Sequence, residues 1–574
     1  MVLQRIFLLF LFQSLGFVQT VQASIKPADL VLTNGKIVTL DKRFGVVQAL
    51  AAHKGKIYRV GKNSDVAKFI GPKTTVIDLK GKLAIPGFIE CHAHFVSLGR
   101  SKMMLPLARA KSWDDIIEQV KTAAKKTPKG EWIIGRGWHQ EKWSTKPKAN
   151  INGYPIHTRL SEITPDHPVL LTHASGHMCF ANAEAMRLAK VTKTTSNPSG
   201  GEILKDGKGN PIGVFRETAQ GLVQRAYQQS LRDRTPEQQK KELTRAIELA
   251  TEECLRNGVT SFQDAGSSFG TIATFKKLAE QGKLKVRLWV MVRTGNMQLA
   301  RLLSQFIMVG FGDNFLTVKA IKVIFDGALG AHGAWLLEPY EDLPMKTGLN
   351  TTSLASLRKT AEIAVKNKCQ LCVHAIGDRA NREVLNVFEA TFKNYPSKNS
   401  RRWRVEHAQH LHPTDIPRFS QLGVIASMQG VHCTSDAAYV LSRLGYRRAS
   451  EGAYMWQSLL RSGAIIANGT DAPVEDISPI ECFYASVTRK LANGAVFFEK
   501  QKMTRQQALK SYTVDAAFAA FEEKIKGTLS PGKLADIVVL SKDLLTIPDR
   551  EILNTRVDYT IVGGRVMYQR KKFR

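Results

Sequence analysis

Several features are scarce or missing in this sequence of 574 residues. No segment repeats at solenoid periods and no tract is of low complexity, which excludes repeat and disordered architectures. Acidic residues are few, since 50 Asp and Glu stand against 82 Lys and Arg and leave a formal net charge of +32. The basic residues are spread along the whole chain and form no nucleic-acid-binding motif. We therefore expect a basic, solvated surface and no nucleic-acid partner.

Cysteine is also scarce. The seven cysteines are an odd number and lie far apart, which does not predict a disulfide framework. Cys369 and Cys372 have the spacing of a redox or zinc motif, but they begin an apolar run and no second pair with this spacing exists. Buried cysteines in a strand are the preferred interpretation.

The first residues differ from the rest of the chain. Ile6 to Val18 is an apolar run behind a single positive charge, and Val21 and Ala23 have the branched and small side chains that a signal peptidase recognises before a cleavage site. We predict a signal peptide over residues 1–23 and a secreted, periplasmic protein that begins at Ser24. The alternative is an uncleaved anchor, but the run is short for a span of about 20 residues. No stable membrane anchor is expected after cleavage.

Both ends of the chain have an all-β character. Residues 24–82 and 525–574 contain short apolar runs separated by glycines, which is typical of strands joined by tight turns. We expect the two ends to form one small β-sandwich. Residues 83–524 alternate strand-like runs with helical periodicity, which indicates an α/β fold with a parallel sheet. Eight such runs favour a (β/α)8 TIM barrel over a doubly wound open sheet.

The predicted barrel strands are Leu83 to His94, Val259 to Asp264, Val286 to Arg293, Thr317 to Asp326, Gln370 to Ile376, Trp403 to His407, Val424 to Met428 and Ala464 to Asp471. The stretch of about 100–250 between the first two strands is far too long for a plain loop. We expect an α+β insertion subdomain there, lying over the barrel mouth. Trp132, Trp138 and Trp143 either line a pocket in this subdomain or form its core.

Histidines and an aspartate end four of the predicted strands. His92 and His94 alternate along a strand, so both imidazoles point to one face. His374, His407 and Asp471 end three further strands, and barrel enzymes carry their catalytic groups at the carboxyl ends of strands. A single histidine of this kind is more often structural, but the set as a whole predicts a metal site.

A lysine lies inside the fourth predicted strand. Lys322 is in an apolar run, where burial of an ammonium group is costly and lowers the pKa. A neutral amine can react with carbon dioxide to form a carbamate, which can bridge two metal ions. The alternative is a buried ion pair with Asp326 or Asp471, and the chemistry of the residues alone leaves both interpretations open.

Several segments resemble, in chain order, the motifs of the amidohydrolase superfamily. They are Pro86 to His94, Asp326 to Ala331, His374 to Ala380, Arg404 to Ala408, Gly469 to Val474 and Gly527 to Ile537. Gly176-His177 with Asn182, and Gly200 to Glu202, resemble the insertion of the YtcJ-like branch (amidohydrolase family 3), which includes N-substituted formamide deformylases. The resemblance covers nearly all of the mature chain. Its motifs are specific for the family and carry little information on the substrate.

The resemblance implies a site with two divalent metal ions. Its ligand positions match His92, His94, Lys322, His374, His407 and Asp471. Lys322 would bridge the ions as a carbamate formed with carbon dioxide, and Asp471 would act as the general base. The ligand types suit Zn²⁺, with iron, manganese or cobalt as alternatives. The implied activity is hydrolysis of a non-peptide C–N bond in an amide, a formamide or a cyclic amide.

His177, Arg379 and His432 are candidate substrate contacts, and His332 stands where this branch often has arginine. The expected partner is a small-molecule substrate, and a homodimer is an option. Two other functions remain open. One is a mononuclear-metal deaminase, which would not need Lys322 as a bridge. The other is a catalytically inactive periplasmic binding protein, which the complete ligand set argues against.

Overall fold

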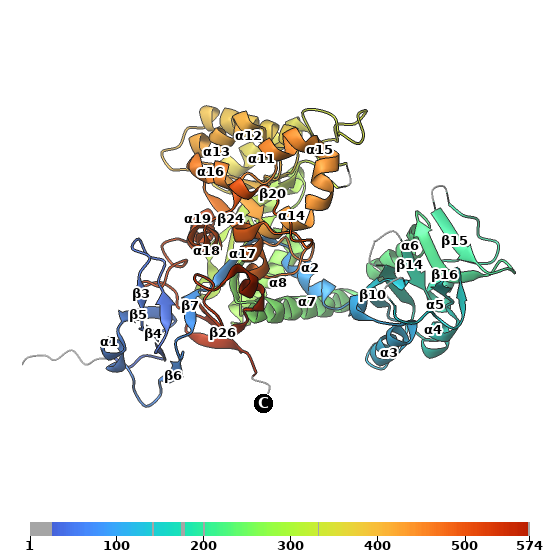
Figure 1. Cartoon of the computed structure of the whole chain (residues 1–574), viewed down its shortest axis with the longest axis horizontal. Coiled ribbons are helices and arrows are strands. Elements are labelled where there is room, and N and C mark those ends of the chain that lie inside the picture. The colour runs from blue at the N-terminus through green and yellow to red at the C-terminus, as the bar shows by residue number, and fades with distance from the viewer. Residues whose placement is uncertain (1–25, 141–142, 174–177, 199–200, 331, 572–574) are drawn as a thin grey trace, which may run out of the picture.

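The computed structural model describes residues 26–140, 143–173, 178–198, 201–330 and 332–571, so the predicted signal peptide lies outside the described residues. The described chain forms a β-sandwich, a barrel and an insertion subdomain (Figure 1). Within these ranges no helix has both the length and the apolar character needed to cross a membrane. All seven cysteines are buried free thiols, as expected from their spacing.

The barrel consists of parallel strands whose apolar residues are buried on both faces. Its order is β8 (Phe88–Ala93), β17 (Val259–Ser267), β18 (Arg287–Val292), β20 (Leu316–Ile324), β21 (Gln370–Ala375), β22 (Arg404–His407), β23 (Ile425–Gln429) and β24 (Ile466–Gly469). The carboxyl ends of the first and last strands meet, because the Asp471 amide donates to the His92 carbonyl at 2.7 Å and the His94 amide donates to the Ala472 carbonyl at 2.8 Å. The predicted TIM barrel is confirmed.

The first predicted barrel strand is two strands in two different sheets. β7 (Leu83–Pro86) belongs to the β-sandwich, and only β8 belongs to the barrel. The break falls at Gly87, where a Cβ atom would lie 2.3 Å from the Thr260 side chain. A larger residue would not fit this close approach, so glycine allows the chain to pass from one sheet to the other.

Helices cover the outside of the barrel and pack on it through apolar stripes (Figure 1). They are α2 (Phe95–Ser101), α7 (Pro236–Arg256), α8 (Phe269–Glu280), α9 (Asn296–Phe306), α11 (Leu354–Lys366), α12 (Asp378–Asn394), α13 (Ile416–Leu422), α14 (Gly430–Ser435), α15 (Ala437–Gly452), α16 (Trp456–Arg461), α17 (Pro479–Thr488), α18 (Arg505–Ser511) and α19 (Val514–Ala519). In α12, for example, Val384, Leu385 and Phe388 are buried on one face, at helical spacing.

The β-sandwich is built from both ends of the chain, as predicted. One sheet has the order β5 (Lys56–Gly61), β4 (Ala49–His53), β1 (Leu30–Thr33) and β6 (Thr75–Asp78). The other has the order β27 (Arg565–Gln569), β26 (Val557–Val562), β25 (Ile537–Leu540), β7, β2 (Lys36–Val38) and β3 (Val46–Val47). Leu32 and Leu50 from one sheet share a buried core with Val539 and Ile561 from the other.

The insertion subdomain has its own mixed sheet and its own apolar cores. The sheet order is β15 (Gly201–Lys205), β16 (Pro211–Glu217), β14 (Met178–Ala181), β13 (Val169–His173), β10 (Ile133–Trp138) and β9 (Leu105–Pro106). Its helices are α3 (Trp113–Ala124), α4 (Thr158–Ile163), α5 (Ala183–Leu188) and α6 (Gln220–Arg232). Figure 1 shows the subdomain standing apart from the barrel, beyond α2 and α7. The expectation that it packs over the barrel mouth is therefore wrong.

The tryptophans of the insertion pack within this subdomain. Trp138 is fully buried, and its indole N–H donates to the Leu171 carbonyl at 2.9 Å. Trp143 packs against the same core, and the Trp132 ring lies 5.4 Å from the Tyr227 ring. The structure therefore supports the core interpretation of these residues over the pocket interpretation.

Candidate metal centre

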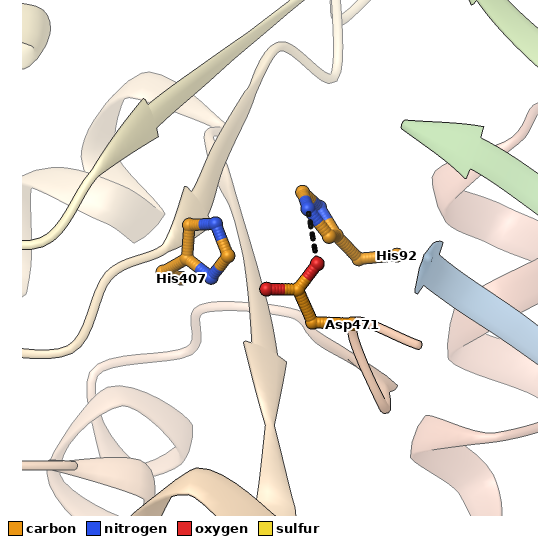
Figure 2. Close-up of side chains that lie close together, drawn as sticks. All are labelled: His92, His407 and Asp471. Carbon is orange, nitrogen blue, oxygen red and sulfur yellow. Dashed lines mark ion pairs between the residues drawn. The ribbon is translucent and has the colours of Figure 1, made fainter. Parts of the chain in front are cut away.

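Three side chains of types that can bind a metal ion meet at the carboxyl end of the barrel. His92 comes from β8, His407 from the end of β22, and Asp471 from the loop after β24. One donor atom from each lies within 4.8 Å of the other two, and all three residues are buried. Figure 2 shows the Asp471 carboxylate between the two imidazoles, with a dashed line marking its ion pair to His92.

The other three predicted ligands surround this group. His94 Nε2 lies 3.3 Å from Asp471 Oδ1, and Lys322 Nζ lies 3.2 Å from His92 Nε2. The His374 ring is 4.4 Å from the His407 ring, measured between centroids. The structure thus brings together all six residues that the sequence predicted as ligands.

The backbone is strained where two of these side chains enter the site. Side chains alternate along an extended strand, so Glu406 and His407 should point to opposite faces of β22. His407 and Ala408, however, have φ angles of +73° and +44°, which end the strand with a sharp turn. Asp471 has a φ of +58°. Left-handed backbone in residues other than glycine is costly and is concentrated at functional sites.

A second layer of polar groups orients the histidines, and the sequence analysis assigned no role to it. Glu406 pairs with His92 Nδ1, and Arg404 lies 2.7 Å from Glu406. His407 Nδ1 lies 2.7 Å from Gln429 Oε1. Such partners accept a hydrogen bond from Nδ1–H, which keeps the proton on Nδ1 and leaves Nε2 free as a ligand. The alternation of Arg404 and Glu406 in an apolar strand was a usable signal, because buried charges need partners.

Glu90 connects the first and last barrel strands below the site. Its carboxyl group accepts hydrogen bonds from the amides of His92 and Thr470, at 3.0 Å and 2.9 Å, and from the Thr470 hydroxyl. Burial raises the pKa of Glu90 to about 8, against the effect of these hydrogen bonds. Glu90 therefore fixes the register of the two strands without placing a full negative charge there at neutral pH.

The electrostatics of the site suit metal ligation. Burial, followed by the nearby charge of Lys322, lowers the pKa of His374 to about 3 and that of His92 to about 4. Burial also lowers the pKa of Lys322. Burial would raise the pKa of Asp471, but the close contact with His94 and the other neighbouring imidazoles lower it below the usual value. The site thus offers neutral imidazoles and an ionised carboxylate, the protonation states that a metal ion requires.

Several polar atoms at the site have no hydrogen-bond partner among the residues that the structure describes. These buried atoms include His374 Nε2, Asp471 Oδ1 and His432 Nε2. A buried polar atom without a partner costs about 1–3 kcal/mol. Imidazole nitrogens and a carboxylate oxygen can each give an electron pair to a metal ion. Their presence together without hydrogen-bond partners fits a bound divalent cation.

The structure places the other candidate contacts in different settings. The His432 ring is stacked 6.1 Å from the His407 ring. The Arg379 guanidinium lies over the Trp335 ring at 5.1 Å and pairs with Glu383.

His332 pairs with Asp342, at 3.1 Å between His332 Nε2 and Asp342 Oδ1. His177 lies outside the described residues. For all four candidate contacts a role in substrate binding stays a prediction.

Comparison with known proteins identifies relatives over nearly the full length. Residues 75–568 match the amidohydrolase family model. The chain is 32% identical to the protein LONG AFTER FAR-RED 3 of Arabidopsis thaliana, over 94% of this chain and 92% of that one. It is 30% identical to YtcJ of Bacillus subtilis, over 88% and 92% of the two chains. It is 26% identical to an N-substituted formamide deformylase of Arthrobacter pascens, over 94% and 98%.

A solved structure has a similar fold. A metal-dependent hydrolase of uncharacterised function from Pyrococcus horikoshii superposes with a TM-score of 0.71 at 27% identity, covering 91% of this chain and 99% of that one. The sequence motifs, the barrel and the ligand set agree with this family match. The chain therefore belongs to the amidohydrolase family, in its YtcJ-like branch.

Proposed function

We propose that this protein is a metal-dependent hydrolase that cleaves a non-peptide C–N bond of a small amide, formamide or cyclic amide. The observation that carries the proposal is the convergence of six ligand-type side chains at one end of the barrel, with donor atoms left unpaired. The similarity to an N-substituted formamide deformylase supports formamides as the first substrates to test.

Two divalent ions, most suitably Zn²⁺, would share this ligand set. His92, His94 and Asp471 would hold one ion, and His374 and His407 the other. The neutral Lys322 amine would add to carbon dioxide with release of one proton, and the carbamate anion would contribute anionic oxygen ligands to the set. The bound ions would supply an activated water molecule and a polarised carbonyl group.

Asp471 would transfer the proton during hydrolysis. Its carboxylate lies between His92 and His407 and is ionised, so it can accept a proton from the attacking water. The same oxygen can then donate this proton to the nitrogen that leaves as the C–N bond breaks. The products would be a carboxylic acid and an amine, or a single chain carrying both groups when the substrate is a cyclic amide.

The metal content of the mature chain, from Ser24 onward, tests the proposal. Elemental analysis should find close to two metal ions per chain, with a clear loss in Lys322→Ala. Lys319→Ala is the matched control, because Lys319 lies three residues earlier on β20 and points to the opposite face. The loaded protein would then be assayed for amine release from N-substituted formamides, N-acyl amines and cyclic amides.

Other results would favour the alternative functions. One metal ion per chain, unchanged in Lys322→Ala, would exclude the bridging role and favour a mononuclear deaminase. No bound metal under metal-replete conditions would favour a binding protein without catalytic activity.

A further inference from the structure

We propose that the His432 Nε2–H group donates a hydrogen bond to the substrate carbonyl oxygen as it gains negative charge, and that Gln409 sets the tautomer that makes this donation possible. This inference rests on the proposed hydrolysis of a C–N bond. It assigns His432 a catalytic role and Gln409 a positioning role.

The position of His432 is fixed beside a predicted metal ligand. His432 is 6% exposed, and its ring is nearly parallel to that of His407, at 15° and 6.1 Å. It lies on α14, which begins where β23 ends. A group held on a short helix directly after a barrel strand lies where barrel enzymes bind their substrates.

Close packing holds α14 in place. The Gly430 amide donates to Asn468 Oδ1 at 2.9 Å, which ties the start of the helix to β24. A Cβ atom on Gly430 would lie 2.5 Å from Ser486 Oγ and 2.6 Å from the Cys482 carbonyl oxygen of α17. Only glycine allows this approach, so the packing fixes the backbone from which the His432 side chain extends.

The hydrogen bond with Gln409 determines which His432 nitrogen carries the proton. Gln409 Nε2 lies 3.0 Å from His432 Nδ1, and an amide nitrogen can only donate. His432 Nδ1 therefore accepts, and in the neutral ring the proton is on Nε2. This Nε2 atom is buried and has no hydrogen-bond partner in the described part of the chain. A buried N–H group without an acceptor is costly, so its burial indicates a ligand that supplies one.

Hydrolysis of an amide supplies such an acceptor. When water adds to the carbonyl carbon, the π electron pair moves to the carbonyl oxygen, which becomes an anion. A preorganised N–H donor stabilises this oxygen more strongly than the neutral carbonyl of the bound substrate. The His432 proton stays on Nε2 throughout, so the ring needs no exchange of protons with solvent.

Three variants distinguish the effect of the Nε2–H donor from the effect of a ring at position 432. His432→Phe removes the donor and keeps a ring of similar size. His432→Gln keeps an amide donor close to the position of Nε2. Gln409→Glu leaves His432 intact, but a carboxylate accepts from Nδ1–H and leaves a lone pair on Nε2.

The first measurement is binding of acetohydroxamate, a metal-binding anion with a carbonyl-type oxygen, to the zinc-loaded full mature chain by calorimetry. His432→Phe and Gln409→Glu should weaken binding by about 10- to 100-fold, as expected for a hydrogen bond to a charged group. His432→Gln should stay within about threefold of the wild type, because it restores a donor. Zinc content should be the same in all four proteins.

With a substrate, His432→Phe and Gln409→Glu should lower kcat by about 10²- to 10³-fold and leave KM nearly unchanged, because the donor acts on charge that develops in the transition state. A loss of zinc in His432→Phe would show that His432 is a metal ligand and would overturn the inference. Wild-type affinity for acetohydroxamate in both His432→Phe and Gln409→Glu would also overturn it. Absence of zinc from the wild type would refute the proposed function itself, and this inference with it.

Discussion

Both ends of the barrel bury charged groups, but the two ends differ in how completely these groups are hydrogen-bonded. At the amino end, Arg287 of β18 is buried and bonded to partners that the chain itself supplies. At the carboxyl end, Lys322, Asp471 and four histidines are gathered, and some of their polar atoms have no hydrogen-bond partner among the described residues. Burial alone therefore does not distinguish a structural charge from a functional one. The distinction comes from whether the chain completes the hydrogen bonding.

The amino-end pair joins the barrel to the β-sandwich. Arg287 Nε and Nη2 donate to the two Asp536 oxygens at 2.7 Å and 3.0 Å. Arg287 Nη1 donates to the carbonyl groups of Asp313 and Asn314, and the guanidinium lies 4.5 Å from the Phe315 ring centroid. Asp536 also accepts the Gly563 amide at 2.8 Å. A planar guanidinium with partners on several edges is fixed and has little capacity for chemistry.

The largest effect that this comparison predicts is on catalysis at the carboxyl end. Asp471→Asn should lower kcat for the best substrate of the amide panel by about 10³-fold or more, because an amide cannot accept the proton of the attacking water. Its free energy of unfolding should fall little or even rise, since charge crowding at active sites costs stability. Rates and urea unfolding of the same samples measure both quantities.

Asp476→Asn is the matched control for that prediction. Asp476 is an exposed carboxylate five residues further along the same loop, and we expect near wild-type rates. A large loss of stability in Asp471→Asn would show that Asp471 is as structural as Asp536, and the contrast between the two ends would fail.

The amino end should show the opposite response. Arg287→Ala leaves the buried Asp536 carboxylate without its charged partner, so the free energy of unfolding should fall by about 3–5 kcal/mol. The metal content per folded chain should not change. The double variant Arg287→Ala/Asp536→Ala should recover part of the loss, which urea unfolding of the double-mutant cycle would measure. A loss of metal in the single variant would show that the two ends are coupled.

The comparison also shows what the sequence could predict. The candidate ligands His92, His94 and His374 could be proposed from strand alternation and from the position of strand ends. The role of Glu406 did not follow, because alternation places it opposite His407 and only the positive φ angles at the end of β22 bring both to the site. These angles depend on contacts of the folded protein, which no local pattern encodes.

Contacts between residues far apart in the sequence could not be predicted for the same reason. Asp536 lies in a recognisable motif, but its partner Arg287 is 249 residues away. The break of the first predicted strand at Gly87 depends on Thr260, a neighbour in space that belongs to another strand. The placement of the insertion subdomain likewise depends on the fold and not on its own residues. The element types could be predicted, whereas their partners required the structure.

The smallest predicted effect concerns a buried histidine that lacks hydrogen-bond partners although we assign it no catalytic role. His410 follows the candidate metal ligand His407 on the chain and is 2% exposed, and neither of its ring nitrogens has a hydrogen-bond partner among the described residues. Its ring packs edge-on against Tyr454, at 5.6 Å between centroids. Unlike His432, it has no hydrogen bond that selects one tautomer, so we expect it to serve packing and not catalysis. Replacement by phenylalanine should therefore preserve metal content.

The pH dependence of stability can test this assignment. Burial lowers the pKa of His410 to about 3 in the folded protein, against about 6.5 in an unfolded chain. The unfolded state therefore binds more protons between these values, so stability is complete above pH 6.5 and is lost as the pH falls towards 3. Between pH 7 and pH 5, metal-free His410→Phe should lose about 2 kcal/mol less stability than the metal-free wild type. If the free energy of unfolding, measured with urea, changed with pH in the same way in both proteins, His410 would take up its proton as readily in the folded state as in the unfolded chain. It would then need a partner inside the site, and its two free nitrogens would belong with those of the metal centre.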